Sequence, residues 1–338
     1  MKSKDTILKI DNLKKHFPIA GGVLGREVAR VYAVDGVTLE LKKGTTLGLV
    51  GESGCGKSTL GRAILKLHEP TDGTITFEGK DITKFNRKEM RPLRRDLQIV
   101  FQDPFASLNP RMSIRQILSE PLEIHGLYKD KQERDKYLKD LMTEVGLRPE
   151  YIDRYPHEFS GGQRQRIGIA RALTLSPKVI VCDEPVSALD VSVQSQVLNL
   201  LNDLQKKYNL SFIFIAHDLA VIEHISDEVV VMYLGKVVEH TTSDELYKNP
   251  RHPYTQALIS SIPVPVVREK RKQAVLEGDV PSPINPPKGC HFNPRCPYAT
   301  DKCRNEAPPL KNVGSKEVPH FVSCHRLDEI PEFEVPKH

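Results

Sequence analysis

The sequence has 338 residues, of which 39% are hydrophobic and 28% are charged, so the chain can bury a full core. The formal net charge is only +5, from 49 Lys and Arg against 44 Asp and Glu, and this balance does not indicate a nucleic-acid-binding surface. The longest apolar run, residues 229–234, is too short to span a bilayer, and the N-terminus lacks the apolar segment of a signal peptide, so neither feature is expected.

Short β-branched runs alternate with helical patterns from residue 1 to about residue 248, which predicts an α/β nucleotide-binding core. Between residues 103 and 159 the sequence becomes charged and helix-forming, broken by prolines, which predicts a helical insertion. After Asn249 prolines crowd together, so the last 80 or so residues are expected to form a separate, loop-rich unit. The expected strands are residues 7–10, 46–50, 74–77, 97–101, 179–181, 212–215 and 228–233.

A glycine-rich loop lies between the expected strand 46–50 and an amphipathic helical run, the order typical of a phosphate-binding loop. Its glycines let backbone amides turn toward phosphates, and Lys57 is placed to reach the β- and γ-phosphates, with Ser58 as a ligand of Mg²⁺. A glycine-rich turn with an incidental lysine is the alternative, and the strand and helix on either side disfavour it. The loop consists of Gly51, Glu52, Ser53, Gly54, Cys55, Gly56, Lys57, Ser58 and Thr59.

Two acidic residues end the apolar strand that begins at residue 179. Asp183 is placed to hold Mg²⁺, and Glu184 to orient and deprotonate an attacking water molecule. His217 follows the next strand, 212–215, where it could contact the γ-phosphate. A lone histidine is generally structural, but its position one strand after the acids favours a functional role.

A second anion-binding helix start is predicted at Ser160, Gly161, Gly162 and Gln163. This stretch resembles the signature motif of ATP-binding cassette (ABC) ATPases, in which it caps the nucleotide held by the opposite subunit.

Other segments match further motifs of the same family in the family's order. Gln102 matches the Q-loop glutamine, which contacts Mg²⁺ and water, and His217 matches the switch histidine. Residues 187–190 match the D-loop. Phe17 is the best match for the aromatic residue that stacks on adenine, with Tyr32 as the alternative.

The resemblance to ABC ATPases implies a P-loop NTPase (RecA-like) α/β core, with an antiparallel β subdomain and an inserted α-helical subdomain at about residues 103–166. It further implies an ATPase domain over residues 1–255 that binds ATP and Mg²⁺ and works as a head-to-tail dimer. Every catalytic position is intact, so hydrolysis is expected rather than nucleotide binding alone.

The stretch at residues 251–258, with the proline-rich, cysteine-containing tail after it, resembles the ending of oligopeptide and dipeptide importers. The resemblance assigns residues 256–338 to a C-terminal region of that type. Residues 105–110, after the Q-loop glutamine, are also typical of that branch. The resemblance implies two transmembrane permease subunits, a second ABC ATPase subunit that is a paralogue or another copy, an extracytoplasmic peptide-binding protein, and a peripheral position on the cytoplasmic face of the membrane.

Three other functions stay open at this point. Relatives in the same branch carry nickel or glutathione instead of peptides. A soluble ABC ATPase of DNA repair or translation would share the core motifs, although it would be expected to carry a coiled-coil insertion or tandem cassettes. A regulatory ATP-binding module without turnover would not require Glu184 and His217.

Four cysteines cluster in the C-terminal region: Cys290, Cys296, Cys303 and Cys324. In a reducing compartment they suit a [4Fe–4S] cluster or Zn²⁺ in a structural role, and unliganded thiols are the remaining alternative. His291, His320 and His325 lie close enough in sequence to act as alternative ligands. Because the phosphate-binding loop is assigned to the other unit, loss of these cysteines is expected to leave ATP binding intact.

Overall fold

The computed structural model describes residues 5–21, 26–262, 278–331 and 333. The chain divides into two compact units, and both are discontinuous in sequence. Unit 1 comprises Met1–Asp5, Leu41–Thr45 and Lys84–Ile215, and unit 2 comprises Thr6–Glu40, Thr46–Thr83 and Ala216–His338. Residues 263–277, which belong to the predicted C-terminal region, lie outside the described residues.

Unit 1 contains three parallel strands in the order β6-β7-β8. They are β6 (Leu97–Val100), β7 (Val179–Asp183) and β8 (Ser211–Ile215). Every residue of β7 and β8 is buried, and the apolar runs within them, residues 179–182 and 212–215, are typical of strands covered on both faces. The helix α6 (Val191–Tyr208) lies between these two strands in the chain; Asp190 caps its start and Asn209, with a φ of 52°, ends it.

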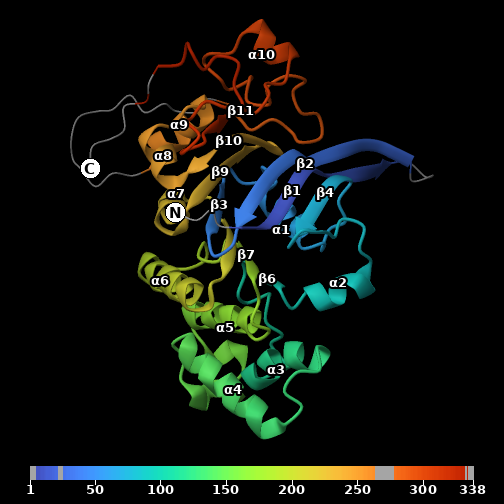
Figure 1. Cartoon of the computed structure of the whole chain (residues 1–338), viewed down its shortest axis with the longest axis vertical. Coiled ribbons are helices and arrows are strands. Elements are labelled where there is room, and N and C mark those ends of the chain that lie inside the picture. Colours follow the sequence, from blue (N-terminus) through green and yellow to red (C-terminus); the bar gives the residue numbers. More distant parts are fainter. Residues whose placement is uncertain (1–4, 22–25, 263–277, 332, 334–338) are drawn as a thin grey trace. The chain divides into compact units, whose positions relative to one another are not determined.

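Unit 1 has helices in the range of the predicted helical insertion and just beyond it. They are α3 (Ile114–Ile124), α4 (Lys131–Glu144) and α5 (Gly161–Leu173), which pack on one another (green in Figure 1). The buried apolar residues of α3 lie at positions 114, 117, 118 and 122, which fall on one face of a helix. The helix α2 (Arg87–Leu93) and the 3₁₀ helices η1 (Pro149–Asp153) and η2 (Pro156–Glu158) complete the unit's helical elements.

Unit 2 contains an antiparallel sheet in the order β2-β1-β4-β5 (blue to cyan in Figure 1), which confirms the antiparallel β subdomain. The strands are β1 (Thr6–Gly21), β2 (Arg26–Lys42), β4 (Asp72–Phe77) and β5 (Lys80–Asp81). In β1 the fully buried Leu8 and Ile10 face Phe77 and Ile75 of β4. The strand β2 was not among the expected strands, although its buried residues alternate at positions 37, 39 and 41.

A second sheet of unit 2 has its strands in the order β11-β12-β10-β9-β3. Parallel pairing joins β3 (Thr46–Val50) to β9 (Glu228–Tyr233), and the remaining pairs are antiparallel: β10 (Lys236–Thr242), β12 (Phe321–Val322) and β11 (Lys311–Asn312). The helices of this unit are α1 (Lys57–Ile64), α7 (Leu219–Ile225), α8 (Ser243–Lys248), α9 (Pro253–Ser260) and α10 (Asp301–Asn305). The last two strands belong to the cysteine-containing region, so this region extends the sheet.

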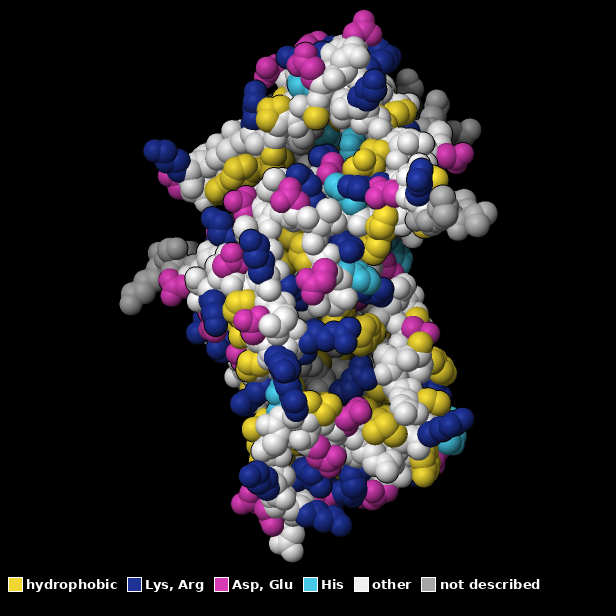
Figure 2. Space-filling view, turned by 90° about the vertical axis from the view of Figure 1, so that its right-hand side faces the viewer, with side chains coloured by type: hydrophobic (Ala, Val, Ile, Leu, Met, Phe, Trp, Pro, Cys, Tyr) yellow, Lys and Arg dark blue, Asp and Glu magenta, His cyan; other side chains and the backbone are white. Residues whose placement is uncertain are grey.

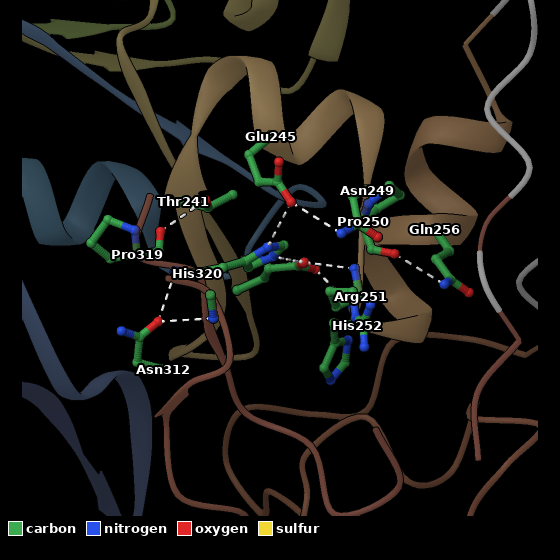
Figure 3. A network of polar contacts seen from close by, with 12 residues as sticks. Thr241, Glu245, Asn249, Pro250, Arg251, His252, Gln256, Asn312, Pro319 and His320 are labelled. Carbon is green, nitrogen blue, oxygen red and sulfur yellow. Dashed lines mark hydrogen bonds and ion pairs between the residues drawn. The ribbon is translucent and has the colours of Figure 1, made fainter. Parts of the chain in front are cut away.

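A buried polar network also attaches the C-terminal region to β10 and α8 (Figure 3). Glu239 is fully buried and accepts hydrogen bonds from the backbone amides of Arg251, at 2.7 Å, and His252, at 2.9 Å. His320 Nε2 lies 2.6 Å from the same carboxylate, and Figure 3 shows its ring directed toward Glu245 as well. A buried carboxylate needs such partners, so the network fixes the path of the chain between β10 and α9.

Charged side chains of both signs lie on the surface. Figure 2 shows Lys and Arg side chains interspersed with Asp and Glu side chains over most of one face. Among the residues that the structure describes, no helix is long and apolar enough to cross a bilayer.

Candidate functional site

The glycine-rich loop of unit 2 requires glycine at two positions. Gly56 precedes α1 with a φ of 105°, and a Cβ atom there would lie 1.9 Å from the carbonyl oxygen of Ala33. Gly51 has a φ of 152°, and its Cβ atom would lie 2.2 Å from the carbonyl oxygen of Met232. Only a residue without a side chain permits this close approach, so the loop has the backbone that a phosphate-binding loop needs.

Lys57 is the first residue of α1 and only 4% of it is exposed. Its Nζ atom donates hydrogen bonds to the carbonyl oxygens of Gly51, at 2.7 Å, and Glu52, at 3.0 Å. The ammonium group is therefore held beside the loop backbone, at the positive end of a helix. A Cβ atom at Gly54 would have no neighbour within 4 Å, so the loop is open at that residue. An open loop with a held cation at a helix start suits phosphate groups.

The remaining loop residues have ordinary surroundings. Ser58 and Thr59 follow Lys57 in the first turn of α1, where a helix has amides without intrahelical partners. Cys55 is buried, and burial raises the pKa of its thiol, which agrees with a space-filling role. Glu52 and Ser53 complete the loop. Arg295, which is not among the residues predicted from the sequence, donates two hydrogen bonds to the carboxylate of Glu52.

The two candidates for adenine stacking differ in their contacts. Phe17 meets His68 edge-on with ring centroids 5.5 Å apart, and Lys15 Nζ lies 4.7 Å from the centre of its ring. The ring of Tyr32 lies 4.5 Å from that of His16. Neither set of contacts decides between them, so the preference for Phe17 stays a prediction.

In unit 1 the structure brings Gln102 and Glu184 together. Asp183 is the last residue of β7 and is 1% exposed. Glu184 follows with a φ of 48°, which is uncommon for a residue with a side chain, and its amide donates to the carbonyl oxygen of Ile215 at 3.0 Å. Gln102 Nε2 donates to Glu184 Oε2 at 2.9 Å. A carboxylate held by an amide at a strained turn is a suitable general base for a water molecule.

The start of α5 forms a complete capping box. Ser160 Oγ accepts a hydrogen bond from the Gln163 amide at 3.3 Å, and Gln163 Oε1 accepts one from the Ser160 amide at 3.0 Å. Gly161 and Gly162 occupy the first turn, and a Cβ atom at Gly162 would lie 2.4 Å from Val193 of α6. The predicted second anion-binding helix start therefore has the expected local structure.

The loop after Glu184 is held by its own hydrogen bonds. Ser187 Oγ donates to the Glu184 carbonyl oxygen at 3.1 Å, and Gln194 Nε2 donates to the carbonyl oxygens of Val186, at 2.9 Å, and Leu189, at 3.1 Å. His217, in unit 2, is exposed and directly precedes Asp218, the cap residue of α7.

The predicted metal site in the C-terminal region has no support in the structure. Among residues 5–21, 26–262, 278–331 and 333, no group of three or more His, Cys, Asp or Glu side chains is arranged to hold a metal ion. Burial raises the pKa of Cys290 to about 12 and that of Cys296 to about 11. The [4Fe–4S] cluster or Zn²⁺ therefore stays a prediction from the sequence.

The three histidines named as alternative ligands have other partners. The Nδ1 atom of His291 lies 2.8 Å from the carbonyl oxygen of Leu234, and the Nε2 atom of His325 lies 3.0 Å from that of Glu306. His320 pairs with the carboxylate of Glu239. These contacts give each ring a structural role.

Comparison with protein families gives two matches along the chain. The family described as "ABC transporter" matches residues 34–187, and the family described as "Oligopeptide/dipeptide transporter, C-terminal region" matches residues 238–303. The first range contains the phosphate-binding loop, the signature residues and both acids of the β7 end.

Similar proteins cover nearly the whole chain. The oligopeptide transport ATP-binding protein AppF of Bacillus subtilis is 55% identical over 96% of this chain and 98% of its own length. OppF of Salmonella typhimurium, also an oligopeptide transport ATP-binding protein, is 53% identical over 98% of this chain and 99% of its own. The dipeptide transport ATP-binding protein DppF of Haemophilus influenzae is 51% identical over 97% and 99%.

Solved structures with a similar fold include two ATP-binding cassettes. One is cbiO1 of Clostridium perfringens, part of the ABC transporter complex cbiONQ, with a TM-score of 0.62 and 30% identity over 72% of this chain and 91% of that chain. The other is the dimeric cassette MJ0796 in a post-hydrolysis state with ADP and Pi, with a TM-score of 0.62 and 27% identity over 70% and 98%.

Proposed function

Because the chain belongs to the ABC transporter family, among its oligopeptide and dipeptide transport ATP-binding proteins, we propose that it is the ATP-hydrolysing subunit of a peptide importer. The observation that carries this proposal is the combination of a complete set of nucleotide motifs with a C-terminal region, residues 238–303, that matches peptide transporters. Nickel or glutathione import would use the same ATPase chemistry. The assignment of peptide as the transported substrate therefore depends on the C-terminal region and not on the ATP site.

Each motif residue has a role in this proposal. Lys57 would bind the β- and γ-phosphates, and the amides at the start of α1 would bind further phosphate oxygens. Ser58, Gln102 and Asp183 offer oxygen ligands of the kind that Mg²⁺ prefers, and the ion would neutralise charge on the phosphates. Glu184 would accept a proton from the attacking water, oriented by its hydrogen bond with Gln102.

The other predicted residues complete the site. His217 would contact the γ-phosphate and Phe17 would stack on adenine. Ser160, Gly161, Gly162 and Gln163 would cap the nucleotide bound by a second ATPase subunit, which is either a paralogue or another copy of this chain. A dimeric cassette bound to ADP and Pi is among the structural neighbours, which supports this arrangement.

Hydrolysis in such a dimer would drive two transmembrane permease subunits, with this chain attached at the cytoplasmic face of the membrane. Peptide would be delivered by an extracytoplasmic binding protein, so selection of the peptide falls outside this chain.

Replacement of Glu184 tests the proposed chemistry. In purified Glu184→Gln protein we expect the ATPase rate to fall by roughly 10²-fold or more, as for loss of a general base, while the affinity for MgATP stays within about threefold. Glu223→Gln, at an exposed position on α7, is the matched control and should hydrolyse ATP normally. An unchanged rate in Glu184→Gln would overturn the assignment.

Transport assays in cells test the substrate class. In a strain that lacks its own peptide-import ATPase, the chain should restore uptake of a labelled di- or oligopeptide when its permease subunits are present, and the Glu184→Gln variant should not. If the chain restores nickel uptake but not peptide uptake, the transported substrate is nickel and the assignment of peptide is wrong.

The hypothesis of a metal group in the C-terminal region rests on the sequence positions of the four cysteines and on their proximity: after burial, the charges of the other three thiols also raise the pKa of Cys290. It predicts about four iron and four sulfide per chain for a cubane cluster, or about one zinc, in anaerobically purified protein. Protein without iron, sulfide or zinc would overturn it.

A further inference from the structure

Arg295, in the C-terminal region, binds the acidic residue of the phosphate-binding loop. Its guanidinium group makes two hydrogen bonds to the Glu52 carboxylate, of 2.7 and 3.1 Å. The side chain of Arg295 is only 6% exposed and that of Glu52 is 26% exposed. A bidentate, largely buried pair of this kind has a fixed geometry, unlike the ion pairs of mobile surface side chains.

Aromatic side chains hold the arginine in place. Phe292 packs edge-on against Tyr233 at the end of β9, with ring centroids 5.2 Å apart, and Arg295 lies 5.9 Å from the centre of the Tyr233 ring. Phe292 also contacts the ring of Tyr254, at 5.4 Å. All three rings are fully or almost fully buried. The position of Arg295 is therefore set by the packed core of unit 2 rather than by the ion pair alone.

The same cluster binds the backbone of the loop. The Glu52 amide donates a hydrogen bond to the hydroxyl oxygen of Tyr254 at 2.8 Å. The carbonyl oxygen of Glu52 accepts one from Lys57 Nζ, the cation proposed to bind phosphate. Glu52 is thus connected both to the C-terminal region and to the phosphate-binding lysine.

The charge of Glu52 opposes the ligand of its own loop. Glu52 is the only acidic residue among residues 51–59, and a nucleoside triphosphate brings several negative charges to this loop. A carboxylate without a cationic partner would repel the phosphates and compete for Lys57. Arg295 supplies the compensating positive charge from a residue that does not belong to the loop.

We propose that Arg295 is a positioning residue of the phosphate-binding loop, through which the C-terminal region neutralises Glu52 and sets the loop's affinity for nucleotide phosphates. This inference rests on the proposed function only in that the ligand is a nucleotide. It gives the C-terminal region a direct part in nucleotide binding, contrary to the expectation that the tail and the loop act independently.

Binding measurements on purified full-length variants test the proposal. We expect Arg295→Ala to weaken MgATP binding by about tenfold in calorimetric titrations and to weaken MgADP binding less, because the diphosphate carries less negative charge. The double variant Arg295→Ala/Glu52→Gln should recover affinity to within about threefold of the wild type, because the repelling charge is gone. Arg304→Ala, which removes an exposed ion pair with Asp301 on α10, is the matched control and should bind normally.

The double variant separates charge compensation from a purely structural role. If Arg295 only anchored the chain, the double variant would bind as poorly as Arg295→Ala, and that result would overturn the proposal. Wild-type affinity in Arg295→Ala would overturn it as well. Arg295→Lys keeps the charge and loses the bidentate geometry, so we expect an intermediate affinity and a folded protein by circular dichroism.

The proposal and the peptide-import function can fail separately. Nucleotide affinity is measured on the isolated chain, whereas import requires the permease subunits. If the Arg295 variants bind MgATP as expected but the chain restores no peptide uptake, the import function is wrong and the role of Arg295 stands.

Discussion

The buried histidine at the start of α9 predicts that the fold weakens in mild acid. His252 is 1% exposed, and its Nδ1 atom accepts a hydrogen bond from the Tyr254 amide at 3.1 Å, so that nitrogen carries no proton. Burial lowers the pKa of His252 to about 4, and the nearby Glu239 carboxylate opposes this shift only in part. The carboxylate is already engaged by His320 and by the His252 amide itself.

The sign and size of the effect follow from the two pKa values. In the unfolded chain a histidine has its ordinary pKa of about 6.5, so between pH 6.5 and pH 4 the unfolded state binds more protons than the folded state. The folded state is fully favoured above about pH 6.5 and loses this advantage as the pH falls toward 4. With a folded pKa of about 4, lowering the pH from 7 to 5 should reduce the free energy of unfolding by about 2 kcal/mol through this residue.

Urea unfolding at pH 7 and pH 5 measures this difference, with circular dichroism or tyrosine fluorescence as the signal because the chain has no tryptophan. The His252→Asn variant keeps a side-chain acceptor for the start of α9, but its side chain does not titrate. Between pH 7 and pH 5 its free energy of unfolding should therefore fall by about 2 kcal/mol less than that of the wild type. His224→Gln, at an exposed position on α7, should keep the wild-type difference. Equal acid sensitivity in His252→Asn and the wild type would refute the reasoning.

Three further substitutions probe the loop and the helix starts. Gly56→Ala should abolish measurable nucleotide binding, since its Cβ atom would lie 1.9 Å from a backbone oxygen at a φ of 105°; normal binding would contradict the described loop geometry. Tyr254→Phe leaves the Glu52 amide without its partner and should cost about 1–3 kcal/mol in urea unfolding, whereas Tyr208→Phe on α6 should cost almost nothing. Ser160→Ala removes a helix cap and should lower stability by about 1 kcal/mol; a larger loss of ATPase activity than of stability would support its contact with a second subunit's nucleotide.

Features that depend on a short stretch of sequence could be predicted. The strand β3 and the loop after it follow from an apolar run, closely spaced glycines and a lysine, because the steric demands of a tight turn are met by neighbours in the chain. The capping box could also be predicted, because Ser160 and Gln163 are only three positions apart in the chain. The helical insertion was found from composition, although its two 3₁₀ helices were not.

The pairing of Glu52 with Arg295 could not be predicted, because the two residues are 243 positions apart and neither belongs to a pattern that requires the other. The acidic residue in the phosphate-binding loop is a signal, because its charge is unfavourable for a phosphate ligand, but it does not say where in the chain a compensating cation lies. The cysteine spacing predicts a metal site, in which ligands from the C-terminal region itself would stabilise that region. In the structure its residues are held from outside, by Glu52, by Glu239 and by the edge of β10. A region with little core of its own can be stabilised by packing on a neighbouring sheet as well as by a metal, and the two possibilities have the same loop-rich sequence.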